Sequence, residues 1–171
     1  MWVSAAVLAV GVIIALASYG RRPDPSLAPF EAAGVMLLIP PESITEVVVS
    51  EGERRWRFER ASPNGWAAAG SPLGESVGAR LDSGLRFLHV SAPQRVLQPQ
   101  EVAGISPSEF GLEPPRYSVS VRSPAAAPFN IDFGALSPQG PAQYACVTGR
   151  DEILLLPSFV GEQWESVISA R

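Results

Sequence analysis

The chain contains no lysine: its thirteen basic residues are all arginine, set against seventeen acidic residues and a formal net charge of −4 over 171 residues. Without lysine, Schiff-base chemistry and lysine-dependent phosphate sites are excluded. A chain with net negative charge also lacks the basic excess that binding to a phosphate backbone usually needs. We therefore predict no nucleic-acid partner.

Cysteine and histidine are equally scarce, with one of each at Cys146 and His89. One cysteine cannot close a disulfide within the chain, and one histidine cannot build a multi-histidine metal site. The sequence has no phosphate loop, dinucleotide-binding motif, nucleophile elbow or zinc-protease motif. We predict no cofactor, no metal and no enzymatic activity.

The remaining candidates for chemistry stand alone in the sequence. His89 could serve as a general base, but it falls in the last turn of a predicted helix, where a cation suits the helix dipole. Cys146 lies in a predicted strand, which favours a small buried apolar residue over a reactive thiolate; a disulfide to another chain stays open if the domain is extracytoplasmic. Asp151 and Glu152 are adjacent and predict solvated turn residues rather than a catalytic pair.

An uncharged apolar run of eighteen residues opens the chain, from Trp2 to Tyr19. As a helix rising about 1.5 Å per residue it would span roughly 27 Å, close to the ~30 Å of a bilayer core. Trp2 and Tyr19 suit the two membrane interfaces, and Arg21 and Arg22 end the run. We predict a retained anchor rather than a cleaved signal peptide, because no basic residue precedes the run and the run continues past the A-x-A-like Ala15–Ala17.

The two arginines that follow the run bear on orientation. Taken alone, the positive-inside bias would place the rest of the chain in the cytoplasm. Gly20–Pro29 then contains three prolines and predicts an extended, semi-rigid spacer. We predict a transmembrane anchor over residues 1–20, a proline-containing spacer over 21–43 and a soluble α+β domain over 44–171; on a wider alternative, the soluble domain begins at about Glu31.

Alternation of apolar and polar residues predicts antiparallel strands in two groups. In the first group, Glu51–Glu53 is a turn between two strands, and Asn64-Gly65 is a turn before a third. The strands of the first group are predicted at Ile44–Ser50, Arg54–Arg60 and Trp66–Ala69. Those of the second group are predicted at Arg116–Arg122, Phe129–Phe133, Gln143–Thr148 and Glu152–Leu156.

Helical periodicity follows each group of strands. Glu75–Val90 carries an apolar stripe of Val77, Leu81, Leu85 and Leu88. Ser158–Ser169 carries a second stripe of Val160, Trp164, Val167 and Ile168. A single helical turn is predicted at Ser106–Glu109, ended by Gly111. These elements predict an α+β fold of antiparallel strand meanders with two helices packed on one sheet face, preceded by a single transmembrane helix.

A local basic cluster lies in the second predicted strand and consists of Arg54, Arg55, Arg57 and Arg60. Acidic residues interleave with it, so charge compensation across and along the strands is the simpler interpretation. The functional alternative is docking of a partner protein or a lipid headgroup. Trp56 and Trp66 are predicted to fill the core, although either could anchor an interface if it is exposed. On the docking alternative, the candidate partner-contact residues are Arg54, Arg55, Trp56, Arg57 and Trp66.

Several short motifs follow one another along the chain in an order that is typical of a known family. They are Ile44-x-x-Val47-x-Val49, Trp56-x-Phe58, Gly65-Trp66, the leucines of Glu75–Val90, Phe110-Gly111-Leu112-x-x-Pro115, the strand Tyr117–Val121, Ile131 with Phe133 and Gly134, Gln143-Tyr144 and Ile153–Leu156. In this order and spacing, Ile44–Ile168 resembles the domain-of-unknown-function 4340 family. The resemblance implies a bacterial envelope protein with an inner-membrane anchor and a periplasmic domain, in some relatives encoded beside ABC-type transport components. It implies no catalytic residue, because none is established for that family.

We therefore predict a non-enzymatic, single-pass accessory or scaffold subunit that contacts other membrane protein subunits. The alternative is a ligand-binding or auxiliary component of an ABC-type transport system, for which Trp56, Trp66 or Tyr144 should line an open cavity. A third hypothesis, an enzyme, would depend on His89 or Cys146.

Overall fold

The computed structural model describes residues 34–63 and 65–170. The predicted anchor with Trp2, Tyr19, Arg21 and Arg22 therefore lies outside the described residues, as does most of the predicted spacer. Within the part of the chain that is described, neither α-helix combines the length and apolar character needed to cross a bilayer.

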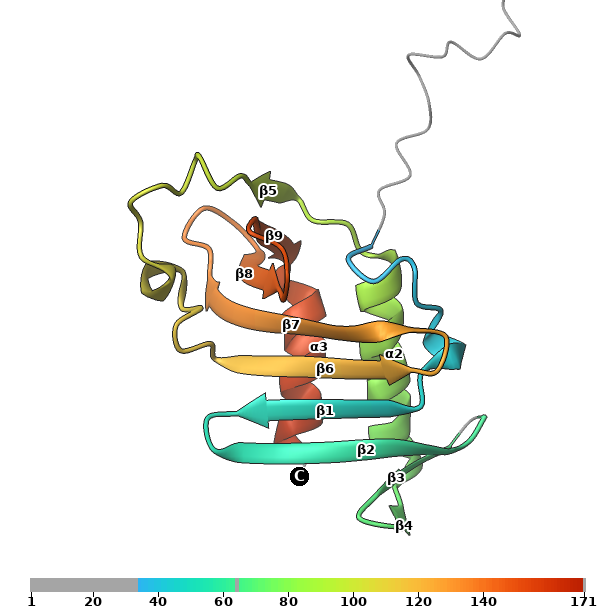
Figure 1. Cartoon of the computed structure of the whole chain (residues 1–171). Coiled ribbons are helices and arrows are strands. Elements are labelled where there is room, and N and C mark those ends of the chain that lie inside the picture. The colour runs from blue at the N-terminus through green and yellow to red at the C-terminus, as the bar shows by residue number, and fades with distance from the viewer. Residues whose placement is uncertain (1–33, 64, 171) are drawn as a thin grey trace, which may run out of the picture. The chain divides into compact units, whose positions relative to one another are not determined.

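In the described residues, nine strands form one antiparallel sheet in the order β4-β3-β2-β1-β6-β7-β8-β9-β5 (Figure 1). Strands β1 and β6 pair in the middle and join the two groups of strands that the sequence predicts. The bounds are β1 Glu46–Glu51, β2 Arg54–Ser62, β3 Gly65–Ala68, β4 Ser71–Pro72, β5 Arg95–Leu97, β6 Tyr117–Ser123, β7 Ala126–Leu136, β8 Ala142–Val147 and β9 Ile153–Pro157.

Both helices lie on the same face of this sheet, as Figure 1 shows. They are α2 (Glu75–Val90) and α3 (Ser158–Ser169), with the bounds predicted from the sequence. Leu81, Leu85 and Leu88 of the first stripe are fully buried, whereas Val77 is half-buried. The prediction of an α+β fold with helices on one sheet face is thus confirmed for the described residues.

Two short 3-10 helices lie in the connections: η2 (Pro41–Ser43) and η3 (Pro107–Phe110). The second matches the turn predicted at Ser106–Glu109. The Ser106 hydroxyl accepts a hydrogen bond from the Ser108 N–H, and Gly111 ends the turn with a φ of +67°, a left-handed conformation that glycine adopts at little cost.

The folded part of the chain begins before the boundary predicted at residue 44. Val35, Met36 and Ile39 are buried in the core, and the Met36 N–H donates to the Leu88 carbonyl at the end of α2. Residues 34–43 are therefore docked on the sheet-and-helix core rather than forming spacer. The spacer was predicted from the three prolines of Gly20–Pro29, which lie outside the described residues, whereas the apolar residues of 34–39 join the buried cluster that includes the leucines of α2.

Candidate functional site

Strand β2 is the basic strand that the sequence singles out, and Arg55 and Arg57 project from it on the open face of the sheet, opposite the two helices. Arg57 is ion-paired with Glu46 at 2.7 Å and with Glu59 at 3.1 Å, and Arg54 is paired with Glu51 at 2.5 Å. Charge compensation, the simpler interpretation, thus holds for these two arginines. Arg55 differs: within the described residues it has no ion pair and is exposed.

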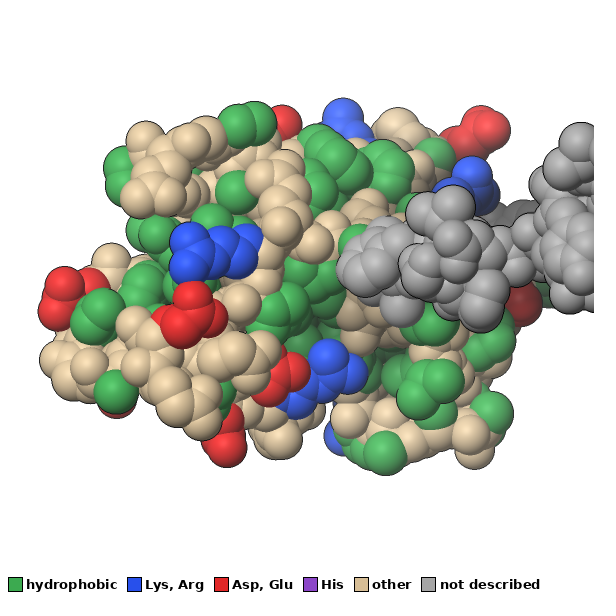
Figure 2. Space-filling model, turned by 90° about the horizontal axis from the view of Figure 1, so that it is seen from above, with side chains coloured by type: hydrophobic (Ala, Val, Ile, Leu, Met, Phe, Trp, Pro, Cys, Tyr) green, Lys and Arg blue, Asp and Glu red, His purple; other side chains and the backbone are tan. Residues whose placement is uncertain are grey.

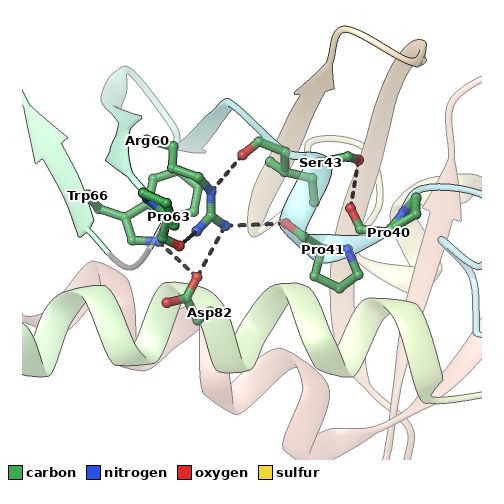
Figure 3. Close-up of polar contacts among 8 residues, drawn as sticks. Pro40, Pro41, Ser43, Arg60, Pro63, Trp66 and Asp82 are labelled. Carbon is green, nitrogen blue, oxygen red and sulfur yellow. Dashed lines mark hydrogen bonds and ion pairs between the residues drawn. The ribbon is translucent and has the colours of Figure 1, made fainter.

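Arg60 points the other way, into the layer between sheet and helices (Figure 3). Its guanidinium donates to the carbonyls of Ile44, Pro41 and Pro63 at 2.8–3.3 Å and lies 3.2 Å from an Asp82 oxygen on α2. It also stacks 4.3 Å from the centre of the Trp66 ring, whose Nε1–H donates to the same Asp82 oxygen. We call this set the Arg60 network; it ties η2, β2, β3 and α2 together.

Trp66 therefore belongs to the packing rather than to a contact surface. It is 2% exposed, as the prediction of a core residue requires, and it therefore offers no surface for the alternative role as a partner contact. Trp56 lies on β2, is half-buried and is accessible from the side of the groove described next. The sequence pattern predicted core positions for both tryptophans and could not show that Trp56 stays partly exposed beside the groove.

A groove of about 550 Å³ runs beside β2, where β3 and β4 turn away from it. Arg55–Glu59 of β2 form one wall and Ala68–Gly70 of the β3–β4 turn form the other. We call this the edge groove. It brings Arg55, Trp56 and Arg57 together, three of the five residues predicted to contact a partner.

A second hollow lies at the end of the molecule where the described chain begins. It has a volume of about 470 Å³ and is lined by 34–39, the start of β7, the β8–β9 hairpin and Val96 of β5. Leu37 and Leu38 are 50% and 91% exposed beside it. Figure 2 shows this end from above, with hydrophobic side chains gathered in a hollow that arginine and carboxylate side chains border. We call this region the apolar end.

The single cysteine is less buried than the sequence predicts. Cys146 lies on the open face, half-buried, directly across from Asp132 on β7. Burial raises the pKa of its thiol, and the charges of Asp132, Glu152 and Asp151 raise that pKa further. The thiol is therefore held protonated near neutral pH, the opposite of what an activated nucleophile needs.

This environment gives a measurable expectation for Cys146. Its alkylation by iodoacetamide should reach half-maximal rate at a higher pH in the folded chain than in the urea-unfolded chain, and Asp132→Asn should lower the folded midpoint. A pH–rate profile for each form checks this. A folded midpoint below the unfolded one would contradict the assignment.

The other residues considered for chemistry do not come together. The His89 ring lies 3.3 Å from the Met36 carbonyl and helps dock 34–39 on α2. Asp151 is exposed in the β8–β9 turn, and Glu152 lies 3.9 Å from Arg150. In the described residues no three His, Cys, Asp or Glu side chains are grouped so that they could hold a metal ion.

The chain was compared with protein-family models, curated proteins and solved structures. None of the three comparisons gave a match. The resemblance to the domain-of-unknown-function 4340 family accordingly stays a prediction from the sequence motifs.

Proposed function

We propose that this protein is a non-enzymatic, single-pass accessory subunit of a bacterial inner-membrane complex, and that its folded domain acts by binding another protein. The observation that carries this proposal is the edge groove, an open site where a strand edge, a half-buried tryptophan and an arginine without an ion pair in the described part of the chain meet. Tryptophan and arginine are the residue types that contribute most binding energy at protein interfaces.

The apolar end supports the membrane part of the proposal. Residues 20–33 separate the uncharged run from the first described residue, and such a stretch can reach no more than about 50 Å even when fully extended. Leu37 and Leu38 follow within five residues of that point and expose apolar surface. Burial of these two leucine side chains in the lipid interface would remove apolar surface from water, which is favourable. We propose that this end faces the bilayer and that the domain is periplasmic.

Native membranes provide the test. A C-terminally tagged chain should resist carbonate extraction and, after solubilisation in mild detergent, should elute well above the size of its own micelle-bound monomer. A C-terminal alkaline phosphatase fusion should be active if the domain is periplasmic. Release by carbonate would contradict the membrane anchor. An inactive fusion would contradict the periplasmic location of the domain, and elution only as a monomer would contradict the accessory role.

The orientation of the apolar end makes a separate prediction. An environment-sensitive fluorophore on Leu38→Cys, in a Cys146→Ser background, should shift to the blue when the chain is reconstituted from detergent into liposomes. The matched control is Leu136→Cys, because Leu136 is 56% exposed and lies at the opposite end of β7 from the apolar end. Equal shifts at the two positions would contradict a membrane-facing role for Leu37 and Leu38.

The hollow at the apolar end favours a second candidate, a ligand-binding component of an ABC-type transport system. Its apolar lining could hold a hydrophobic molecule. However, of the three aromatic residues that this hypothesis relies on, only Trp56 lines a groove: Trp66 is buried and Tyr144 packs edge-on against Phe110 at 5.0 Å. Titration with anilinonaphthalene sulfonate tests this candidate. If the dye binds in the hollow, the cavity-filling variant Val96→Trp should weaken its binding; equal binding by the variant and the wild type would contradict a ligand site there.

A further inference from the structure

The β2 edge that borders the edge groove has backbone N–H and C=O groups that no described strand pairs with. The Arg60 N–H donates to the Thr45 carbonyl at 2.9 Å, on the β1 side of the strand. Hydrogen bonding alternates along an antiparallel pair, so the even-numbered residues of β2 bond to β1 and the odd-numbered ones face outward. Glu59 uses its outward side to pair with Ala67 of β3.

Strand β3 does not continue this pairing. Its register with β2 covers only Glu59–Ser62, with an irregularity after Arg60, and β3 then turns into β4. Arg55 and Arg57 consequently face the edge groove with their backbone N–H and C=O groups, and no described strand pairs with them there. An exposed strand edge of this kind is a template for pairing with another extended chain.

We propose that the edge groove binds an extended segment of a partner protein, which adds to the sheet as an antiparallel strand beside Arg55 and Arg57. This deepens the proposed function by naming the chemistry of the partner. The segment would exchange backbone hydrogen bonds with these two residues, and the volume of the groove leaves room for its side chains.

The side chains around the edge specify the sequence of that segment. Arg55 and Arg57 project on the open face, whereas Trp56 projects on the helix face beside Ala68. Residues of an added strand alternate between the same two faces. The partner therefore places acidic residues opposite the arginines, above all opposite the unpaired Arg55, and an apolar residue between them against Trp56.

A second copy of this chain fits the edge poorly. Self-pairing of two antiparallel β2 edges would set arginine directly opposite arginine, because the outward-facing positions that remain free are Arg55 and Arg57. Like charges directly opposite each other on paired strands are destabilising. The charge pattern thus selects an acidic partner and disfavours self-association through this edge.

The test uses the full-length chain in detergent and a fluorescein-labelled peptide of eight residues with alternating glutamate and valine. We expect saturable binding by fluorescence anisotropy, weakened about tenfold or more by Arg55→Pro, which removes an outward N–H and the unpaired charge but no bond to β1. Arg55→Glu, which reverses the charge and keeps the backbone N–H, should weaken binding similarly. This variant carries the test if Arg55→Pro does not fold. The matched control is Arg86→Glu, at an exposed arginine of α2 with no ion pair among the described residues, which should leave binding unchanged.

Three results would overturn the proposal. They are no binding of the peptide to the wild-type chain, equal binding by Arg55→Glu and the wild type, and undiminished binding of a peptide N-methylated at alternate amides, which cannot pair with a strand edge. Dimerisation of the peptide-free chain that Arg55→Glu alters would instead assign the edge to a second copy. Because the experiment uses purified protein, its failure leaves the elution of the chain in a larger assembly as an independent result.

Discussion

Replacing Trp164 by alanine is expected to lower the free energy of unfolding by about 3–5 kcal/mol, the largest loss for any single substitution considered. Trp164 lies on α3, is fully buried and is the largest fully buried side chain of the core. Its ring packs so closely on Gly84 of α2 that a Cβ there would come within 2.9 Å of the indole carbons. Removing the indole would leave a large cavity between the two helices and the sheet.

Trp164→Phe is the control for this prediction. The indole Nε1–H of Trp164 is buried and has no hydrogen-bond partner among the described residues, so phenylalanine removes an unsatisfied donor while keeping most of the ring volume. Its loss should be less than half that of the alanine variant. Urea denaturation of the full chain, followed by circular dichroism in detergent, gives both values. Equal losses for the two variants would contradict tight packing at this contact.

Replacing Arg60 by methionine is expected to lower the free energy of unfolding by about 2–4 kcal/mol, because methionine keeps the apolar stem of the side chain and removes every polar contact that Arg60 makes in the Arg60 network. The Arg60 side chain is 11% exposed. Without it, the carbonyls of Ile44, Pro41 and Pro63 and the Asp82 carboxylate lose a donor (Figure 3). The connection from η2 to β1 should loosen as well.

Arg57→Met is the matched control on the same strand. Arg57 also makes two ion pairs, but its side chain is 59% exposed and solvent screens the charges, so the loss should stay below about 1 kcal/mol. The same denaturation experiment compares the two variants. A loss at position 57 as large as that at position 60 would show that the Arg60 network contributes no more than a surface ion pair.

The helices and most strands could be predicted because their patterns are local. The leucine stripe of α2 and the Trp164 face of α3 repeat with helical period and correspond to the buried faces. The Ser106 cap and Gly111 likewise fix the bounds of η3 through contacts within a few residues.

Features that depend on distant parts of the chain were not predictable in this way. Strand β5 has only three residues and exists because β9 pairs with it. The buried hydroxyl of Tyr117 donates to the Gly161 carbonyl at 3.0 Å, and the Gln143 amide donates to the Gly134 carbonyl at 2.9 Å. Both buried polar groups thus depend on partners in other elements, which no local pattern indicates. Packing against α2 likewise placed Val35, Met36 and Ile39 in the core.

The candidate site shows the same division. The alternation in β2 correctly predicted that Arg55 and Arg57 share a face, and interleaved glutamates correctly predicted ion pairs for Arg54 and Arg57. The edge groove itself exists because β3 leaves β2 after three paired positions, and no local pattern indicates that departure. The contacts of Trp66 were not predictable from a local pattern either, because its partners Asp82 and Arg60 belong to two other elements.

Site-specific photo-crosslinking in native membranes tests the central claim most directly, namely that this chain binds a protein partner through the edge groove. A photoreactive amino acid at position 69, on the wall of the edge groove opposite Arg55, should give a discrete covalent adduct with another membrane protein subunit, and the same group at position 86 should give none. The adduct should also disappear on Trp56→Ala, which removes the large apolar side chain of the β2 wall. Adducts of equal yield at positions 69 and 86, or no adduct at position 69 in membranes that retain the chain, would contradict the account.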